Sequence, residues 1–235
     1  MKCQNCYNSM KAEYKFCHQC GQSVVVIQKP LKPVLKDMFH EMLDIDGKVL
    51  ITLKSMILKP GLLSKEYCDG KRMKYTPPLR LYLVISFICL AMLALLDSYD
   101  SGSEMGVHAL KEFGPKLMFI MLPVFALILQ LLFARTYYLS NLIFSIHIHC
   151  VIYFVYILIF TISLGAFWNL SDGIVSMLLF FELPLVFYLL IYIAFALKRF
   201  YQQTWIKTLT KWAFLIMSYL TIAYGIFQLI MILNS

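Results

Sequence analysis

Hydrophobic residues are distributed very unevenly along this chain. The first 78 residues are polar and rich in lysine, whereas residues 79–235 are dominated by leucine, isoleucine, phenylalanine and tyrosine. A helix needs about 20 mostly apolar residues to cross the hydrocarbon core of a bilayer. The pattern therefore predicts an all-α integral membrane protein with a five-helix transmembrane bundle, whose spans cover residues 79–96, 117–133, 141–164, 174–197 and 213–233.

The basic residues predict how these five helices are oriented. Of the 21 lysines and arginines, 19 fall in residues 1–80, 134–140 and 198–212. The connection 97–116 holds the other two basic residues together with four acidic residues, and the connection 165–173 holds no basic residue. Because cytoplasmic flanks carry most lysine and arginine, we expect a bacterial inner-membrane protein with a cytoplasmic N-terminus and a C-terminus outside. The net charge of +8 is then explained without nucleic acid.

Two short apolar stripes precede the first predicted span. Apolar residues recur at helical spacing over residues 34–43 and again over residues 49–57, with charged residues on the opposite side. Such stripes predict amphipathic helices at the headgroup boundary or beneath the bundle. Residues 24–33 contain Pro30 and Pro33 and are therefore predicted to be a linker.

Tryptophan residues indicate where the membrane boundaries are expected. Trp168 lies in a predicted outer loop, and Trp205 and Trp212 precede the fifth predicted span. These amphipathic rings favour the headgroup level of a bilayer. Residues 200–211 are interpreted as a separate short helix on the cytosolic face.

Composition and cysteine usage indicate the cellular compartment. The chain is 60% hydrophobic and 14% charged, whereas soluble domains average about 25% charged residues. No cleavable signal peptide is recognisable at the N-terminus, so we expect this end to stay on the side of synthesis. Four of the seven cysteines fall within residues 3–20. This clustering and the odd total favour a metal site in a reducing compartment over a disulfide framework.

The clustered cysteines form two Cys-x2-Cys pairs separated by ten residues. Two such pairs can hold Zn²⁺ with four thiolates, which leaves no open coordination position for catalysis. We therefore predict a structural zinc ribbon whose ligands are Cys3, Cys6, Cys17 and Cys20, with metal binding as the source of its folding energy. His18 is an alternative ligand, and a redox role of the cysteine pairs is an alternative function.

A loop rich in glycine, proline, tyrosine and cations lies directly before the first predicted span. Cations such as Lys71, Arg72 and Lys74 can meet phosphate headgroups, each contributing about 1 kcal/mol at an anionic surface. Two interpretations stay open, namely a basic membrane anchor made of turn residues and a specific headgroup or phosphate site. The candidate residues are Tyr67, Gly70, Lys71, Arg72, Lys74 and Tyr75.

Polar residues inside the predicted spans are functional candidates, because placing them in lipid is costly. His147 and His149 are about 200° apart around a helix and therefore cannot ligate one metal together. Interhelical hydrogen bonding, a proton or small-ligand pathway, and chemistry are the three interpretations we consider. Depth along the helices predicts an outer pair, which consists of Glu182 and Gln228. It also predicts an inner cluster near the cationic loop, which consists of Gln130, Arg135, Asn141, His147 and His149.

The chain has a specific combination of features: a short four-cysteine ribbon, then Pro60-Gly61, then Gly70-Lys71-Arg72, and then a hydrophobic bundle. The combination continues in residues 135–138, 144–149 and 198–205. The combination resembles a family of uncharacterised bacterial membrane proteins, the domain-of-unknown-function family numbered 3667. The resemblance implies a multi-span membrane protein with a zinc ribbon and implies no reaction. Where the family tends to have an acidic-histidine pair, this chain has Ser140-Asn141, which weakens any metal or catalytic role at that position.

Three regions follow from these patterns. Residues 1–23 form the zinc ribbon, residues 24–78 contain the linker, the amphipathic helices and the cationic loop, and residues 79–235 form the bundle. The sequence favours a non-enzymatic scaffold or adaptor whose ribbon recruits a cytosolic protein partner or an anionic lipid. It leaves the oligomeric state open.

Two other function classes are less favoured. A transporter or permease for a small or lipid-like substrate would use Glu182, His147 and His149, but five spans without an internal repeat speak against it. An enzyme is the least favoured class, because no Gly-x-Ser-x-Gly, His-Glu-x-x-His or phosphate-binding glycine-rich motif occurs. Nucleic-acid binding is not expected, since the ribbon has no dense basic and aromatic face.

Overall fold

A computed structural model describes residues 2–11, 14–22, 48–99, 105–167, 180 and 182–233 of the chain. The described part is helical apart from the ribbon and its connections, and the ribbon contains a β-bridge between Lys2 and Ser9. Its seven helices are α2 (Val49–Leu58), α3 (Leu62–Cys68), α4 (Pro78–Tyr99), α5 (Met105–Leu132), α6 (Tyr138–Phe167), α8 (Glu182–Tyr201) and α9 (Trp205–Leu233). The predicted linker, the stripe at 34–43 and Trp168 lie outside the described residues.

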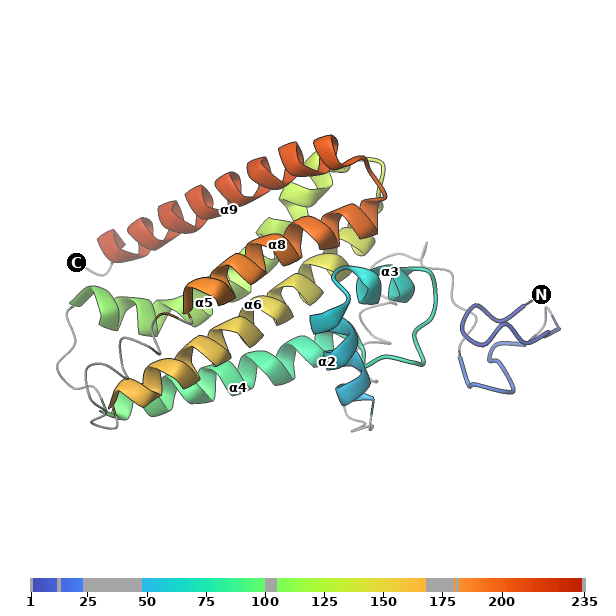
Figure 1. The fold of residues 1–235 in the computed structure, drawn as a ribbon, viewed down its shortest axis with the longest axis horizontal. Helices are drawn as coiled ribbons and strands as arrows, with labels where there is room; N and C mark the ends of the chain where they lie inside the picture. Colours follow the sequence, from blue (N-terminus) through green and yellow to red (C-terminus); the bar gives the residue numbers. More distant parts are fainter. Residues whose placement is uncertain are drawn as a thin grey trace.

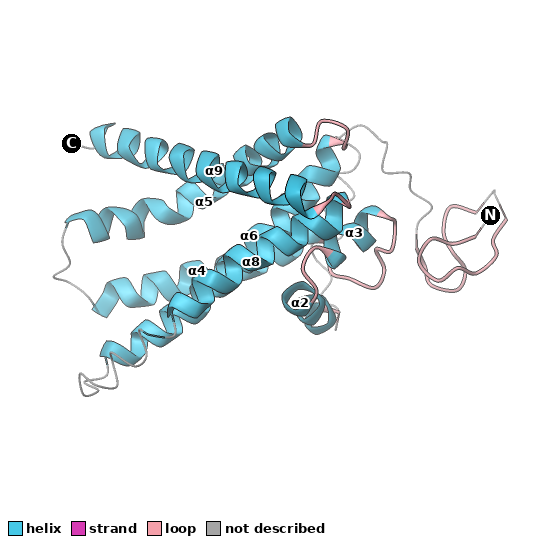
Figure 2. Ribbon diagram, turned by 45° about the horizontal axis from the view of Figure 1, so that its top comes forward, coloured by secondary structure: helices cyan, strands magenta, loops and turns pink. Residues whose placement is uncertain are grey.

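Five long helices, α4, α5, α6, α8 and α9, run alternately in opposite directions (Figure 1). The ribbon, α2 and α3 lie at the end of the bundle where α4, α6 and α9 begin, and the C-terminus lies at the opposite end (Figures 1 and 2). Helix α6 contacts α4, α5 and α8, and α9 packs against α5 and α8. Helix α6 is therefore the centre of the bundle.

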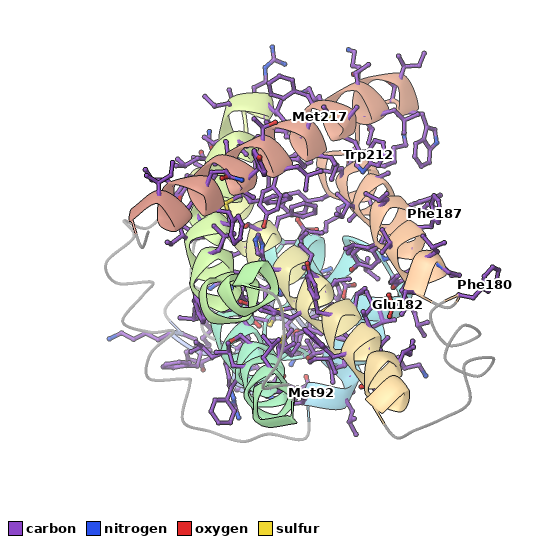
Figure 3. The ribbon with its side chains drawn as sticks, turned by 90° about the vertical axis from the view of Figure 1, so that its left-hand side faces the viewer. Met92, Phe180, Glu182, Phe187, Trp212 and Met217 are labelled. Atoms are coloured by element: carbon purple, nitrogen blue, oxygen red, sulfur yellow. The ribbon has the colours of Figure 1, made fainter. Side chains whose placement is uncertain are left out.

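Three of these helices are long and apolar enough to cross a membrane, which indicates a membrane protein. The apolar stretches are Tyr138–Ile162, Glu182–Tyr201 and Trp205–Leu229, and shorter apolar stretches occur at Pro78–Leu93 and Phe119–Leu132. Exposed side chains on the outer helices are themselves apolar, as Phe187 of α8 and Met217 of α9 show (Figure 3). Such a surface suits lipid better than water.

Residues 200–211 do not form the separate helix that the sequence suggested. Helix α8 continues to Tyr201, Gln202 turns the chain with a φ of 53°, and α9 then runs without a break from Trp205 to Leu233. No proline or glycine interrupts the chain between Trp205 and Gly225. The helix therefore continues through the expected membrane boundary at Trp212, because nothing in the sequence stops it.

Helix α2 forms where the second apolar stripe predicts a helix, and it packs beneath the bundle. The hydroxyl of Tyr192 donates to the carbonyl of Met56 at 2.6 Å, and that of Tyr188 donates to the carbonyl of Ile57 at 2.8 Å. Gly61 then starts α3 with a φ of 71°, and a β-carbon there would lie 2.5 Å from the Ala196 carbonyl oxygen. Only glycine accommodates both this φ and this close approach to α8.

Candidate metal centre and adjoining cationic loop

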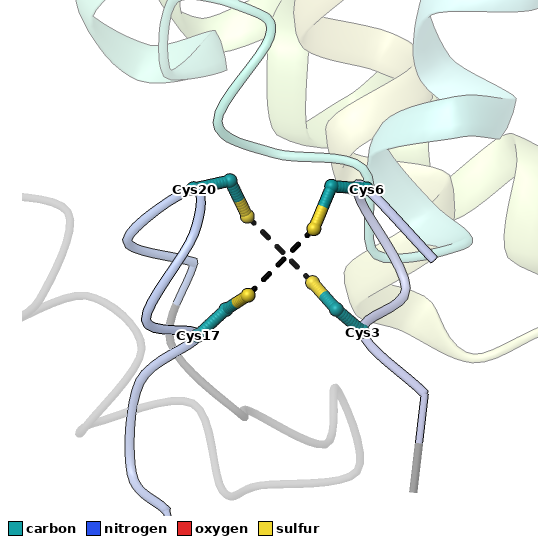
Figure 4. Close-up of side chains that lie close together, drawn as sticks. All are labelled: Cys3, Cys6, Cys17 and Cys20. Atoms are coloured by element: carbon teal, nitrogen blue, oxygen red, sulfur yellow. Dashed lines mark hydrogen bonds between the residues drawn. The ribbon is translucent and has the colours of Figure 1, made fainter. Parts of the chain in front are cut away.

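The four clustered cysteines converge on one point in the ribbon (Figure 4). Their sulfur atoms all lie within 4.8 Å of one another. The Sγ atoms of Cys3 and Cys20 are 3.7 Å apart, and those of Cys6 and Cys17 are 3.6 Å apart. A tetrahedral site with Zn–S bonds of about 2.3 Å has sulfur–sulfur edges of about 3.8 Å. The cluster is therefore compatible with metal binding.

Two equivalent backbone turns aim these sulfurs. The amide of Tyr7 donates to the carbonyl of Cys3, and the amide of Gly21 donates to the carbonyl of Cys17, both at 2.9 Å. Tyr7 and Gly21 have φ values of 59° and 70°. A glycine at position 21 is typical of this left-handed backbone conformation, whereas Tyr7 adopts the same conformation at the equivalent position of the first turn.

The local electrostatics of the ribbon favour a thiolate at Cys17. The backbone amides of Cys20 and Gln19 lower the pKa of the Cys17 thiol to about 6, because they donate to its sulfur. His18 does not point into the cluster. Its Nε2 lies 3.2 Å from the Asn8 Nδ2 and accepts that amide hydrogen, so the structure gives no support to His18 as a ligand.

The ribbon is docked on the cationic loop by one buried glutamine. The side-chain amide of Gln22 donates to the carbonyl of Gly70, and its oxygen accepts from the amides of Arg72 and Met73, each at 3.2 Å. The carbonyl of Gln22 in turn accepts from the amide of Cys17 at 2.8 Å. Gln22 therefore connects the second cysteine turn directly to the loop, a contact that no pattern in the sequence predicts.

Two further contacts join the ribbon to the same loop. The side chain of Gln4 lies so close to Gly70 that a β-carbon there would collide with it. The ammonium group of Lys71 lies 5.6 Å from the centre of the Tyr7 ring. Tyr7, with Glu66 as a second cause, raises the pKa of Lys71.

Glu66 offsets part of the positive charge of the cationic loop. Lys71 and Lys74 approach the Glu66 carboxylate at 3.5 and 3.7 Å, and the Tyr75 hydroxyl donates to it. Burial opposes ionisation of Glu66, but Tyr75, Lys74 and Lys71 together lower the pKa of Glu66 below its ordinary value. Glu66 is thus a central member of the loop that the sequence interpretation missed.

Arg72 differs from the two lysines of the loop. Its guanidinium lies over the ring of Tyr67, 5.5 Å from the ring centre. Its Nε is buried and has no hydrogen-bond partner among the described residues. The six candidate residues of the loop are thus gathered at one end of the bundle, but only Arg72 keeps a charge that Glu66 does not pair.

Polar side chains also connect the bundle to the segment that carries the loop. Ser64 of α3 and His147 of α6 form a buried hydrogen bond of 2.9 Å. Arg199 of α8 donates to the carbonyl of Pro60 at 2.9 Å. Residues 56–75 are therefore attached to the bundle on one side and to the ribbon on the other.

The predicted inner polar residues separate into distinct groups. Asn141 donates to Gln130 at 2.8 Å and accepts from the Tyr201 hydroxyl at 2.7 Å, which links α5, α6 and α8. His149 lies elsewhere, with Nδ1 2.8 Å from the Ser145 carbonyl and Nε2 3.2 Å from the Tyr219 hydroxyl. Nδ1 must donate to that carbonyl, so Nε2 accepts from Tyr219.

The remaining predicted intramembrane residues lie near surfaces. Arg135 is exposed in the turn between α5 and α6, and Gln228 is exposed on α9. Glu182 is half-buried at the start of α8 (Figure 3). Because Gln228 is exposed, the structure does not bring it and Glu182 together as a buried pair.

Comparison with known sequences identifies one segment of the chain. Residues 46–90, which include α2, α3, the cationic loop and the start of α4, match the profile of the family described as "Protein of unknown function (DUF3667)". No curated protein and no solved structure matches the chain. The segment that matches is therefore the one that joins the ribbon to the bundle.

Proposed function

Residues 46–90 match a family of unknown function, and we propose from the geometry that the chain is a non-enzymatic adaptor of the bacterial inner membrane. A zinc ribbon is presented at the cytosolic end of a five-span bundle and recruits a cytosolic protein partner. The cationic loop lies at the level of anionic headgroups. The observation that carries the proposal is the Gln22 contact, because it fixes the ribbon to a loop that is itself attached to the bundle.

The positions of the basic segments support this topology. The described parts of residues 1–80, 134–140 and 198–212 all lie at the ribbon end of the bundle (Figure 1). A cytosolic location of this end follows from the preference of lysine and arginine for cytoplasmic flanks. Helices α4 and α5, whose described apolar stretches are shorter, supply the two further spans of the proposal.

The chemistry of the cysteine cluster supports zinc with a structural role. Four thiolates and sulfur separations of 3.6 and 3.7 Å suit tetrahedral Zn²⁺. Four protein ligands leave no position for a substrate or a reactive water. The ribbon then acts as a shaped surface rather than a catalyst.

The exposed face of the ribbon suggests the chemistry of the partner. Tyr14 and Phe16 are exposed, and residues 1–23 contain three lysines, Lys2, Lys11 and Lys15, against one acidic residue, Glu13. An acidic partner surface with an apolar centre would complement this face.

A transport role receives less support from the same geometry. Both ring nitrogens of His149 are hydrogen-bonded within the protein, which suits interhelical bonding. Gln228 is exposed on the outer helix α9, where it lines no enclosed path. We therefore keep the adaptor as the proposed function.

Crosslinking and affinity capture of the full chain from native membranes test the proposal. Wild type and Gln19→Ala should capture the same cytosolic protein, because the Gln19 side chain is exposed. Cys17→Ser should lose this protein, and Gln22→Ala should capture less of it. An identical set of captured proteins from all four variants would contradict the adaptor role.

The topology is tested separately with reporters at both ends. A reporter active only outside the cytoplasm should be active when fused after Ser235 and inactive when fused before Met1. Cytosolic reporters at both ends would contradict five spans.

A further inference from the structure

Two buried nitrogen atoms, each on a side chain that contacts the same tyrosine ring, have no hydrogen-bond partner among the described residues. They are the Nε of Arg72 and the Nε2 of His147. Arg72 lies over the Tyr67 ring, 5.5 Å from its centre, and the His147 ring packs edge-on to the same ring at 6.3 Å. Buried polar atoms are nearly always paired, so two unpaired ones at one place indicate a missing partner.

Hydrogen-bond accounting identifies what His147 offers to that partner. The only described hydrogen bond of Ser64 Oγ joins it to His147 Nδ1 at 2.9 Å. If Ser64 accepted this bond, its own buried hydroxyl hydrogen would lack an acceptor, so Ser64 is the donor. The hydrogen of the neutral ring is then on Nε2. His147, which is 3% exposed, therefore presents an unpaired N–H donor.

Arg72 offers a donor of the same kind, with a permanent charge. Its backbone amide is held by Gln22, which fixes the start of the side chain. The neighbouring cations are already engaged, since Lys71 and Lys74 pair with Glu66. One carboxylate offsets only one of these two charges, so the loop keeps a net positive charge, and Arg72 is its cation without an ion pair to a described residue.

We propose that Arg72 and His147 bind the phosphate group of a ligand between α3 and α6. The two donors come from different elements, and a tetrahedral phosphate presents oxygens in several directions at once. Arg72 supplies the countercharge and His147 supplies a neutral N–H donor. The phosphate belongs to the headgroup of an anionic phospholipid or to a free phosphate ion. The inference depends on the proposed function only for the lipid source.

The site explains a feature of the contact between the loop and the bundle. Ser64 fixes the ring orientation of His147 from α3, and Gln22 fixes Arg72 from the ribbon. Both donors are therefore positioned by residues that are not themselves ligands. Ser64 and Gln22 are positioning residues of the site.

Phosphate binding to the full, zinc-loaded chain tests the proposal. Titrations with inorganic phosphate and glycerol 3-phosphate use neutral phosphatidylcholine nanodiscs, and a second arm adds phosphatidylglycerol to the nanodiscs. Thermal shift and ³¹P resonance broadening report binding. Binding of either soluble probe assigns a free phosphate source, and a response confined to phosphatidylglycerol assigns the lipid headgroup.

Matched variants assign the ligands. Arg72→Gln should weaken binding by at least about tenfold, as the loss of a charge-assisted hydrogen bond predicts. Lys207→Gln, which removes an exposed cation of α9 outside the loop, should change binding less than about twofold, because solvent screens a charge that does not contact the phosphate. His147→Phe should weaken binding as Arg72→Gln does, and His147→Gln, which keeps an amide donor near the Nε2 position, should retain part of it.

The double variant decides whether the two residues share one ligand. If both contact the same phosphate, Arg72→Gln combined with His147→Phe is less damaging than the product of the single effects. Multiplicative effects, an equal loss in Lys207→Gln, or full binding by a folded His147→Phe variant would overturn the proposal, as would no response to any probe. Because none of these readouts involves the captured protein partner, failure of the site and failure of the adaptor role are distinguishable.

Discussion

The ribbon and the bundle are stabilised in opposite ways. The buried core of the described ribbon consists of Cys3, Met10 and Cys17, with Cys6 and Cys20 packed against it. The core of the bundle is a continuous set of apolar side chains that extends from Met56 to Leu215. One core thus consists almost entirely of candidate metal ligands, and the other contains none of them. The chain therefore combines a part built around a candidate metal site with a part built on apolar packing.

The largest expected effect separates these two cores. Cys17→Ser, or removal of metal by a chelator, should unfold the ribbon completely, because structural Zn²⁺ supplies about 10–16 kcal/mol to such domains. The bundle should keep its helices. Metal content, proteolysis of residues 1–22 and helical circular dichroism measure the three quantities. Loss of bundle helicity together with the metal would contradict the comparison.

Gly61→Ala should destabilise the bundle side of the molecule. The new β-carbon would lie 2.5 Å from the Ala196 carbonyl oxygen at a φ of 71°. Backbone strain and overpacking predict a loss of about 2–4 kcal/mol. Thermal unfolding in detergent measures it. Gly225→Ala is the matched control, because no atom lies within 4 Å of its added β-carbon, and an equal loss there would refute the packing explanation.

Gln22→Ala should uncouple the two parts without unfolding either. Three hydrogen bonds to Gly70, Arg72 and Met73 are lost. This loss predicts that docking of the ribbon on the loop becomes weaker by about 1–3 kcal/mol. Hydrogen exchange of the Arg72 and Met73 amides should accelerate, while bound zinc stays at the wild-type level. Gln19→Ala should leave both quantities unchanged, and slow exchange in Gln22→Ala would show that other contacts hold the loop.

The smallest expected effect concerns Glu66 and pH. Its pKa in the folded chain is lowered by Tyr75, Lys74 and Lys71, so its contribution is present above its ordinary pKa and is lost as the pH falls through the folded value. Glu66→Gln should therefore be less stable than wild type at neutral pH, by about 0.5–1 kcal/mol. The difference should disappear in acid. Melting temperatures of both proteins across this pH range measure it, and a constant difference would contradict the assignment.

Local patterns were the most predictable part of the molecule. The two Cys-x2-Cys pairs predicted that four sulfurs would come together, because each pair forms its own short turn. The period of apolar residues predicted a helix at 49–57 and the positions of the long helices. The prediction of a separate helix at 200–211 was wrong. It placed the boundary between loop and span by hydrophobicity alone, and α9 extends through that boundary.

Contacts between distant segments could not be predicted from one sequence. Gln22 and Arg72 are 50 residues apart, and Ser64 and His147 are 83 apart. Depth along the helices correctly indicated that Gln130 and Asn141 lie at similar levels, and they are hydrogen-bonded. The helical period predicted that His147 and His149 point to different sides of their helix, but it could not show which neighbours they contact, since that depends on how α3 and α9 pack against α6.

The hydrogen bonds of Gln22 to the loop affect which substitutions the loop can accept. Every atom that its amide contacts belongs to the main chain of Gly70, Arg72 or Met73. The side chains of Arg72 and Met73 can therefore be exchanged while the docking geometry persists, whereas Gly70 cannot be replaced, because a β-carbon there would collide with Gln4. Recognition residues of the loop can therefore change while the ribbon keeps its position relative to the bundle.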